Sequence, residues 1–144
     1  MRKGFIKSIL ALFLAWLPGL GCVQENGGIR VENLSPQEVK ARLDSSRQIV
    51  LIDVRQQHEF TGPLGHIEGA RLLPRHFLED HVEELRAIEG KELVVYCRSG
   101  NRSSRAARSL AAKGIRVINM TGGMLRWNEL GYPVVRNGKD NDRE

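Results

Sequence analysis

A chain of 144 residues has the length of one globular domain and can bury a core without disulfide staples. Its composition, 41% hydrophobic and 27% charged, excludes a disordered chain. The formal net charge is +5, but the basic residues Arg2, Lys3 and Lys7 lie in a segment that we expect to be removed, which leaves 19 basic against 17 acidic residues. With a net charge near +2 and no concentrated basic stripe, the sequence gives no support for a nucleic-acid partner.

Residues 1–22 have the three-part layout of a secretory signal peptide. Positive residues at the start precede nine apolar ones, Ile9 to Leu17, and Pro18 and small residues follow. The apolar run is shorter than the roughly 20 residues that span a bilayer. We therefore expect export, to the periplasm, with a buried N-terminal helix as the alternative. The segment ends in "GLGC", which resembles the lipobox of bacterial lipoproteins, so Cys22 is a candidate for lipidation and for a membrane tether.

The chain has two cysteines, Cys22 and Cys97. Export favours disulfides, so a bridge between the two is one interpretation. Lipidation or removal of Cys22 would instead leave Cys97 as a lone thiol in an oxidising compartment. Such a thiol is a liability unless it is buried or used.

The first elements follow a short polar linker at residues 23–28. Ser35 is suited to be an N-cap, Pro36 to be the first helical residue and Glu38 to complete a capping box, which predicts a helix over 36–43. The continuous apolar run Ile49–Asp53 is typical of a strand covered on both faces.

The middle of the chain is less regular. Residues 54–69 contain three glycines and a proline and predict a loop. A short strand over "ARLL" is expected next. It precedes a helical pattern in which Phe77, Val82 and Leu85 would share a buried face.

The second half predicts a regular alternation of strands and helices. The elements are strand 92–97, helix 103–113, strand 116–120, a turn at "TGG" and helix 124–130. This alternation predicts an α/β domain over residues 29–136, with a central parallel sheet and helices on both faces, followed by a polar tail at 137–144. The four histidines show no metal-ligand spacing.

Ligands of such folds bind at the carboxyl ends of the strands, where Cys97 and Asp53 both fall. Backbone N–H groups of the tight turn after Cys97 and the start of the next helix would form an anion-binding concavity. Arg98 and Arg102 add forked donors suited to oxyanions. This setting favours a thiolate, hence a nucleophile, and a place for a bound anion. The alternative is a buried structural cysteine, which needs no flanking arginines.

Five motifs carry a family resemblance: "LIDVR" with Asp53 and Arg55, Glu59 with Phe60, "GHIEGA" at 65–70, "CRSGNRS" at 97–103, and "TGGMLRWNELGYPV" at 121–134. In this order and spacing they resemble the single-domain rhodaneses, or thiosulfate sulfurtransferases, from about Val31 to Val135. The fold expected from the resemblance is a single rhodanese-like domain of the α/β class.

The resemblance implies a two-step covalent mechanism. Cys97 would take the outer sulfur of thiosulfate or a similar small anionic donor as a persulfide and pass it to a thiol or cyanide. The residues of the following loop would bind the sulfur and the donor: Arg98, Ser99, Gly100, Asn101, Arg102 and Ser103. Four residues would have supporting roles: Asp53, Arg55, Glu59 and His66. Of these, His66 would order its own loop. Neither a metal nor an organic cofactor is implied, and no protein partner is specified.

Three alternatives remain open at this point. Protein tyrosine phosphatases also place a cysteine before an anion-binding loop and an arginine, but their loop is longer than the four residues between Cys97 and Arg102. A catalytically silent rhodanese module used for binding or delivery would not need the cysteine and both arginines that this chain retains. A redox role for Cys97 would lack a second mature cysteine to resolve it. The segment "FTGPL", between Glu59 and Gly65, is longer than the compact family form, which predicts an altered donor and acceptor preference.

The tether at Cys22 can be tested on the mature protein expressed in a bacterium. Lipidation predicts an added acyl mass and partition into the detergent phase, because several acyl chains anchor a domain stably. Partition into the aqueous phase without acyl mass would show plain cleavage near this position.

Overall fold

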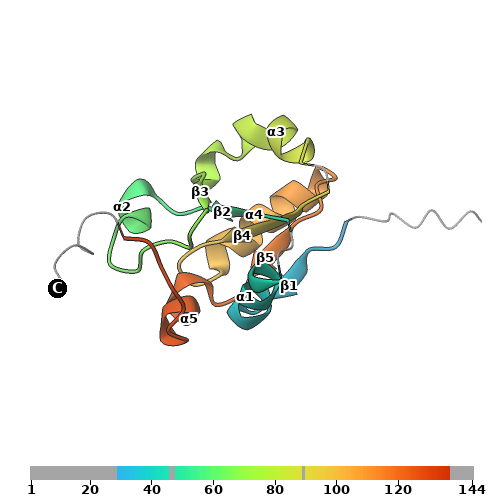
Figure 1. The fold of residues 1–144 in the computed structure, drawn as a ribbon. Helices are drawn as coiled ribbons and strands as arrows, with labels where there is room; N and C mark the ends of the chain where they lie inside the picture. The colour runs from blue at the N-terminus through green and yellow to red at the C-terminus, as the bar shows by residue number, and fades with distance from the viewer. Residues whose placement is uncertain (1–28, 46–47, 89, 137–144) are drawn as a thin grey trace, which may run out of the picture.

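The computed structural model describes residues 29–45, 48–88 and 90–136 (Figure 1). The predicted signal segment with Cys22, the linker at 23–28 and the tail at 137–144 lie outside these residues. Within the described ranges, no helix is long and apolar enough to cross a membrane.

Five parallel strands form the sheet, which confirms the predicted α/β class. They are β1 (Glu32–Leu34), β2 (Ile49–Asp53), β3 (Arg71–Leu72), β4 (Glu92–Tyr96) and β5 (Ile118–Met120). Their order in the sheet is β1-β5-β4-β2-β3, so β4 lies in the centre. β1 was not predicted: it has three residues, too few for an apolar pattern, and it forms by pairing with β5, which is remote in sequence.

Helices pack on both faces of the sheet, as the sequence predicts. They are α1 (Pro36–Asp44), α2 (Gln57–Phe60), α3 (Val82–Arg86), α4 (Asn101–Ala112) and α5 (Gly123–Glu129). Figure 1 shows α1 and α5 together on one side of the sheet and α3 on the other. α4 shares the core of the α3 side, because Ala106, Ala107 and Leu110 pack with Leu85 and Val95. The small alanines allow α4 to approach the central strand closely.

The two faces of β4 bury alternate residues. Val95 points into the core beneath α4, whereas Val94 and Tyr96 belong to the opposite core together with Val39 of α1 and Trp127 of α5. Val94, Val95 and Tyr96 are all 0% exposed. A strand covered on both faces has no polar side to alternate with, which explains the continuous apolar run.

The start of α1 follows the predicted capping box. The Ser35 Oγ accepts a hydrogen bond from the Glu38 N–H at 3.3 Å, and the Glu38 carboxylate accepts one from the Ser35 N–H at 2.7 Å. Pro36 occupies the first helical position, where no backbone donor is needed. The helix ends at Asp44, one residue later than predicted.

Three local predictions were wrong in detail. The expected loop at 54–69 contains α2, a single turn that begins after Gln56 with a capping box to Glu59. Phe77 does not share a buried face with Val82 and Leu85: it is 47% exposed, because its segment forms two 3-10 turns before α3 rather than one helix. Three residues per turn rotate a side chain away from the face that an α-helix would give it. α4 begins at Asn101, two residues before the predicted start.

A buried ion pair ties the segment after α2 to the end of β2. Asp53 is 0% and Arg55 1% exposed, and the Arg55 Nη2 donates to the Asp53 carboxylate at 2.6 Å and to the carbonyl oxygen of Gly65 at 2.7 Å. Next to it, the Tyr96 hydroxyl accepts a hydrogen bond from the Ile67 N–H at 3.3 Å. Burial beside the Asp53 charge raises the pKa of Tyr96, so its phenol keeps its proton. The segment 54–69 is therefore fixed at the carboxyl edge of the sheet.

We expect Asp53→Asn to lower the free energy of unfolding by about 3–5 kcal/mol, because it leaves the buried Arg55 charge without its counterion. Asp44→Asn is the matched control: Asp44 pairs with Lys40 on the surface of α1, and its loss should cost at most about 1 kcal/mol. Urea unfolding of the two variants measures both values. Equal effects would contradict the importance assigned to the buried pair.

Candidate active site

Cys97 directly follows β4, at the carboxyl end of the central strand. It is a free thiol and is 1% exposed. The backbone around it is held by the sheet, because Tyr96, the residue before it, accepts a hydrogen bond from the Val54 N–H at 3.0 Å. The thiol is therefore fixed at the edge of the sheet where ligands of parallel α/β folds bind.

The residues Arg98–Ser103 form a turn around the sulfur and are here called the cysteine loop. Gly100 has a φ of 94°, a left-handed conformation that glycine adopts without strain, and this conformation brings its N–H to 3.2 Å from the Cys97 Sγ. The Ser103 hydroxyl lies 3.5 Å from the same sulfur and 3.1 Å from the Gly100 carbonyl oxygen. Since α4 begins at Asn101, its first turn is part of the loop and its positive end faces the thiol.

These donors determine the protonation of Cys97. Burial by itself raises the pKa of the thiol, but hydrogen bonds from the Ser103 hydroxyl and from the backbone amides of Ser103, Ser99 and Gly100 outweigh it, so the pKa lies below its usual value. The sequence predicted a favoured thiolate. In the structure, the pKa of Cys97 is lowered mainly by this set of hydrogen bonds, whereas the sequence analysis had emphasised the charges of Arg98 and Arg102.

The start of α5 holds the cysteine loop from the other side. The Met124 N–H donates to the Cys97 carbonyl oxygen and the Leu125 N–H donates to the Arg98 carbonyl oxygen, both at 2.9 Å. Gly123 makes this approach possible, because a Cβ at this position would lie 2.3 Å from the Cys97 carbonyl oxygen. Sequence reasoning treated "TGG" as a simple turn and missed this role. The signal was two consecutive glycines directly after a strand, which indicate close backbone approach.

Arg102 forms a bidentate ion pair with Glu59 rather than projecting freely toward a ligand. Its two terminal nitrogens donate to the two carboxylate oxygens, each at 2.6 Å. The Arg102 guanidinium lowers the pKa of Glu59 to about 2, so the carboxylate stays ionised at any ordinary pH. The pair connects α2 to the first turn of α4. By contrast, Arg98, Ser99 and Asn101 are exposed.

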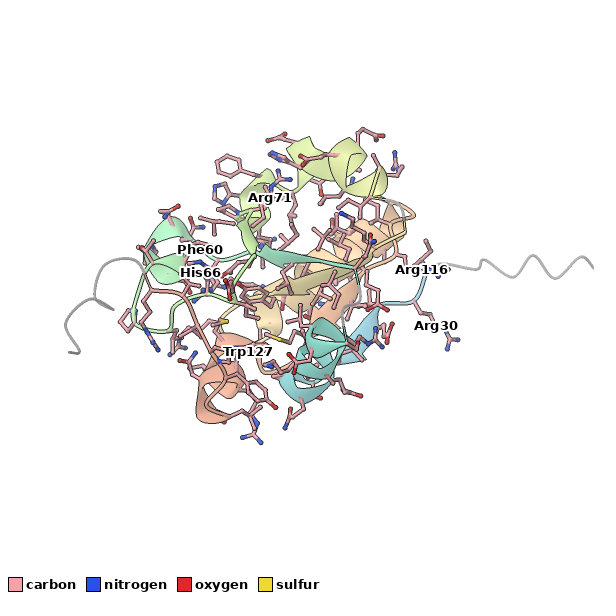
Figure 2. All side chains as sticks on the ribbon, in the orientation of Figure 1. Arg30, Phe60, His66, Arg71, Arg116 and Trp127 are labelled. Atoms are coloured by element: carbon pink, nitrogen blue, oxygen red, sulfur yellow. The ribbon has the colours of Figure 1, made fainter. Side chains whose placement is uncertain are left out.

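The contacts of His66 are with Phe60 and Val135, outside the cysteine loop. Its ring stacks on Phe60 with the ring centroids 3.6 Å apart, and its Nδ1 lies 3.1 Å from the Phe60 carbonyl oxygen (Figure 2). Its backbone pairs with Val135 in an isolated antiparallel bridge. This placement orders the segment beside α2, whereas the structure brings Asp53, Arg55, Glu59 and Arg102 to the edge of the sheet next to the cysteine loop.

Two of the hollows in the described part of the chain lie at the ends of the strands. One of about 350 Å³ borders the cysteine loop at Arg98 and is lined also by Arg55, His58, Glu59, Pro63 and Leu64. A larger one of about 490 Å³ lies at the amino-terminal ends of β4 and β5, where it is lined by residues such as Glu92, Ile118 and Arg116. The larger hollow is at the opposite end of the strands from Cys97, so the smaller one is the hollow at the candidate site. No group of three or more potential ligands in the described ranges could hold a metal ion.

The comparison with protein families agrees with this geometry. Residues 35–130 match the Rhodanese-like domain family. The chain belongs to the rhodanese family, and sulfur transfer is the activity at the level of this family.

Individual relatives carry corresponding names. A sulfurtransferase of Allochromatium vinosum is 32% identical over 106 residues, which are 73% of this chain and 95% of the relative. A thiosulfate sulfurtransferase of Ectopseudomonas mendocina is 35% identical over 97 residues, 67% of this chain and 84% of the relative. Other curated relatives are longer: the chain spans 48% of one and 24% of another. Among solved structures, a rhodanese-like domain protein of Staphylococcus aureus has a TM-score of 0.63 at 27% identity and covers 73% of this chain and 99% of its own.

Ser103→Ala should raise the pKa of Cys97, because the thiolate loses a hydroxyl donor while its burial is unchanged. The pH dependence of thiol alkylation measures this pKa, and its midpoint should move to higher pH. Ser104→Ala is the control, since the neighbouring Ser104 hydroxyl accepts from Arg108 instead. A midpoint unmoved by Ser103→Ala would show that the hydroxyl does not donate to the sulfur.

Proposed function

We propose that the protein is a sulfurtransferase that carries sulfane sulfur as a persulfide on Cys97, from thiosulfate or a similar anionic donor to a thiol or cyanide. The observation that carries the proposal is the buried thiol with a lowered pKa, surrounded by backbone and hydroxyl donors. The same donors that stabilise a thiolate can stabilise the negative outer sulfur of a persulfide. The thiosulfate sulfurtransferase named among the relatives supports the choice of donor.

In the first step the Cys97 thiolate attacks the outer sulfur of thiosulfate. The new bond joins the Cys97 Sγ to that sulfur, the sulfur–sulfur bond of thiosulfate breaks, and its electron pair leaves with sulfite. The cysteine loop offers the developing anion the N–H of Gly100 and the hydroxyl of Ser103, which are already in place before the reaction. Exposed Arg98 is positioned to attract the doubly charged donor.

In the second step an acceptor nucleophile attacks the outer sulfur of the persulfide. The bond between the two persulfide sulfurs breaks, and Cys97 leaves as a thiolate. The lowered pKa of Cys97 makes it a good leaving group as well as a nucleophile. Asp53, Arg55 and Glu59 support the surrounding backbone in this proposal and do not touch the reacting atoms.

The setting we propose is the periplasm, with the domain held at a membrane by a lipid on Cys22. This part rests on the sequence pattern of residues 1–22 alone, which lie outside the described residues. The periplasm is an oxidising compartment. Burial of the Cys97 thiol, which is 1% exposed, would protect it there from unspecific oxidation.

The first experiment is the intact mass of the reduced chain from Val23 onward, before and after exposure to thiosulfate. We expect a gain of one sulfur atom, lost again on addition of cyanide, because the persulfide is formed and then discharged at the same thiol. Cys97→Ser is the control and should gain nothing. If neither thiosulfate nor a small persulfide donor adds sulfur, the chain is not a sulfur carrier, and a binding role takes its place.

A further inference from the structure

The hollow at Arg98 borders the cysteine loop and has the size of a small-molecule site. Its volume is about 350 Å³, at the lower end of the roughly 300–1,000 Å³ found for ligand pockets. None of the residues 99–103 that surround the sulfur lines it. The pocket therefore adjoins the cysteine loop at Arg98, outside the donors around the sulfur, and it is far larger than cyanide or sulfite requires.

The walls of this pocket are held rigidly against the backbone of the nucleophile. Arg98 follows Cys97 directly, and the Leu125 N–H fixes its carbonyl oxygen at 2.9 Å. On the facing side, Arg55 follows Val54, whose N–H is bonded to Tyr96, the residue before the nucleophile. Through Arg98, the pocket wall is therefore joined directly to the backbone of Cys97.

Most charges that line the pocket are already paired. Arg55 is bound to Asp53, and Glu59 is bound to Arg102. Arg98 has no ion-pair partner among the described residues, and it is exposed, as is His58. The unpaired charge that the pocket offers a ligand is therefore the positive charge of Arg98.

The remaining wall is apolar. Pro63 and Leu64 come from the segment "FTGPL", which the sequence analysis singled out for its extra length. Leu64 is held in place because its carbonyl oxygen accepts from the Asn128 amide at 3.1 Å. The pocket therefore pairs a short apolar surface with one available guanidinium.

We propose that this pocket binds the sulfur acceptor, and that the acceptor is a small thiol with a short apolar stem and a carboxylate. The proposal rests on the proposed sulfur transfer and names its acceptor class. The carboxylate pairs with the Arg98 guanidinium, which matches its two oxygens. The stem contacts Pro63 and Leu64, and the thiol is directed at the persulfide.

The transfer step balances without a further reactant. The acceptor thiol gives its proton to the negative outer sulfur of the Cys97 persulfide. The resulting acceptor thiolate attacks that sulfur, and a new sulfur–sulfur bond forms on the acceptor. The bond from that sulfur to the Cys97 Sγ breaks, and its electron pair stays on Cys97 as a thiolate. The products are an acceptor persulfide and the starting form of the enzyme.

The kinetic test uses mature protein loaded with persulfide and confirmed by mass. Discharge rates are measured with mercaptopropionate and with mercaptopropanol, which differ in the carboxylate. The native protein should prefer mercaptopropionate, and Arg98→Gln should lower the ratio of the two rates about fivefold, the upper end for a solvent-exposed ion pair. Arg116→Gln is the control for net charge, since Arg116 lies on the opposite side of the molecule from Phe60 and His66 (Figure 2). A native ratio without preference, or one that Arg98→Gln leaves unchanged, overturns the proposal.

A binding measurement separates the pocket from the sulfur chemistry. The mature Cys97→Ser protein is titrated with S-methyl mercaptopropionate, which cannot accept sulfur, and backbone amide shifts are followed by NMR. Binding should move the amide signals of His58, Leu64 and Arg98, and Arg98→Gln should raise the dissociation constant obtained from the shifts of His58 and Leu64 about fivefold. Absence of shifts overturns the pocket as a carboxylate site. Failure of persulfide formation in the mass experiment would instead end the proposed function, and with it the acceptor role.

Discussion

The site depends on the contact between the start of α5 and the backbone on either side of the Cys97–Arg98 peptide. Two N–H groups of Met124 and Leu125 donate to the carbonyl oxygens of Cys97 and Arg98. With these carbonyls held by α5, the Gly100 amide of the cysteine loop is free to donate to the sulfur. The contact is possible only because residue 123 has no Cβ, since one would lie 2.3 Å from the Cys97 carbonyl oxygen. The N–H groups at the start of α5 are thus used to hold the backbone of the cysteine loop.

The charges around the thiol are arranged in closed pairs, and this arrangement determines what acts on the sulfur. Asp53 is bound to Arg55, and Glu59 is bound to Arg102. Burial raises the pKa of Cys97, and the hydrogen bonds from Ser103, Ser99 and Gly100 lower it further than burial raises it. Arg98, outside these pairs, keeps its charge for a ligand. The result is a thiol controlled by fixed dipoles next to a single cation at the pocket.

Local patterns predicted much of the fold, and their failures have local causes. The capping box of Ser35 and Glu38 and the apolar run of β2 were predictable because each is made by neighbouring residues. β1 was not predicted because its three residues form a strand only when β5 is present to pair with them. Phe77 was assigned to the core because its spacing fits an α-helix, whereas the chain there forms 3-10 turns and leaves the ring 47% exposed.

The sequence by itself indicated Cys97 as the candidate nucleophile, together with the loop that follows it and their place at a strand end, because all of these lie within one short stretch from β4 to α4. Only the tertiary structure decided which arginine is available: Arg102 is taken by Glu59, 43 residues earlier in the chain, and Arg98 is not. Only the fold also brought Gly123 against Cys97 and Leu64 beside Arg98. Sequence patterns describe residues that are neighbours along the chain. Ion pairs, close backbone contacts and pocket walls join residues that become neighbours when the sheet forms.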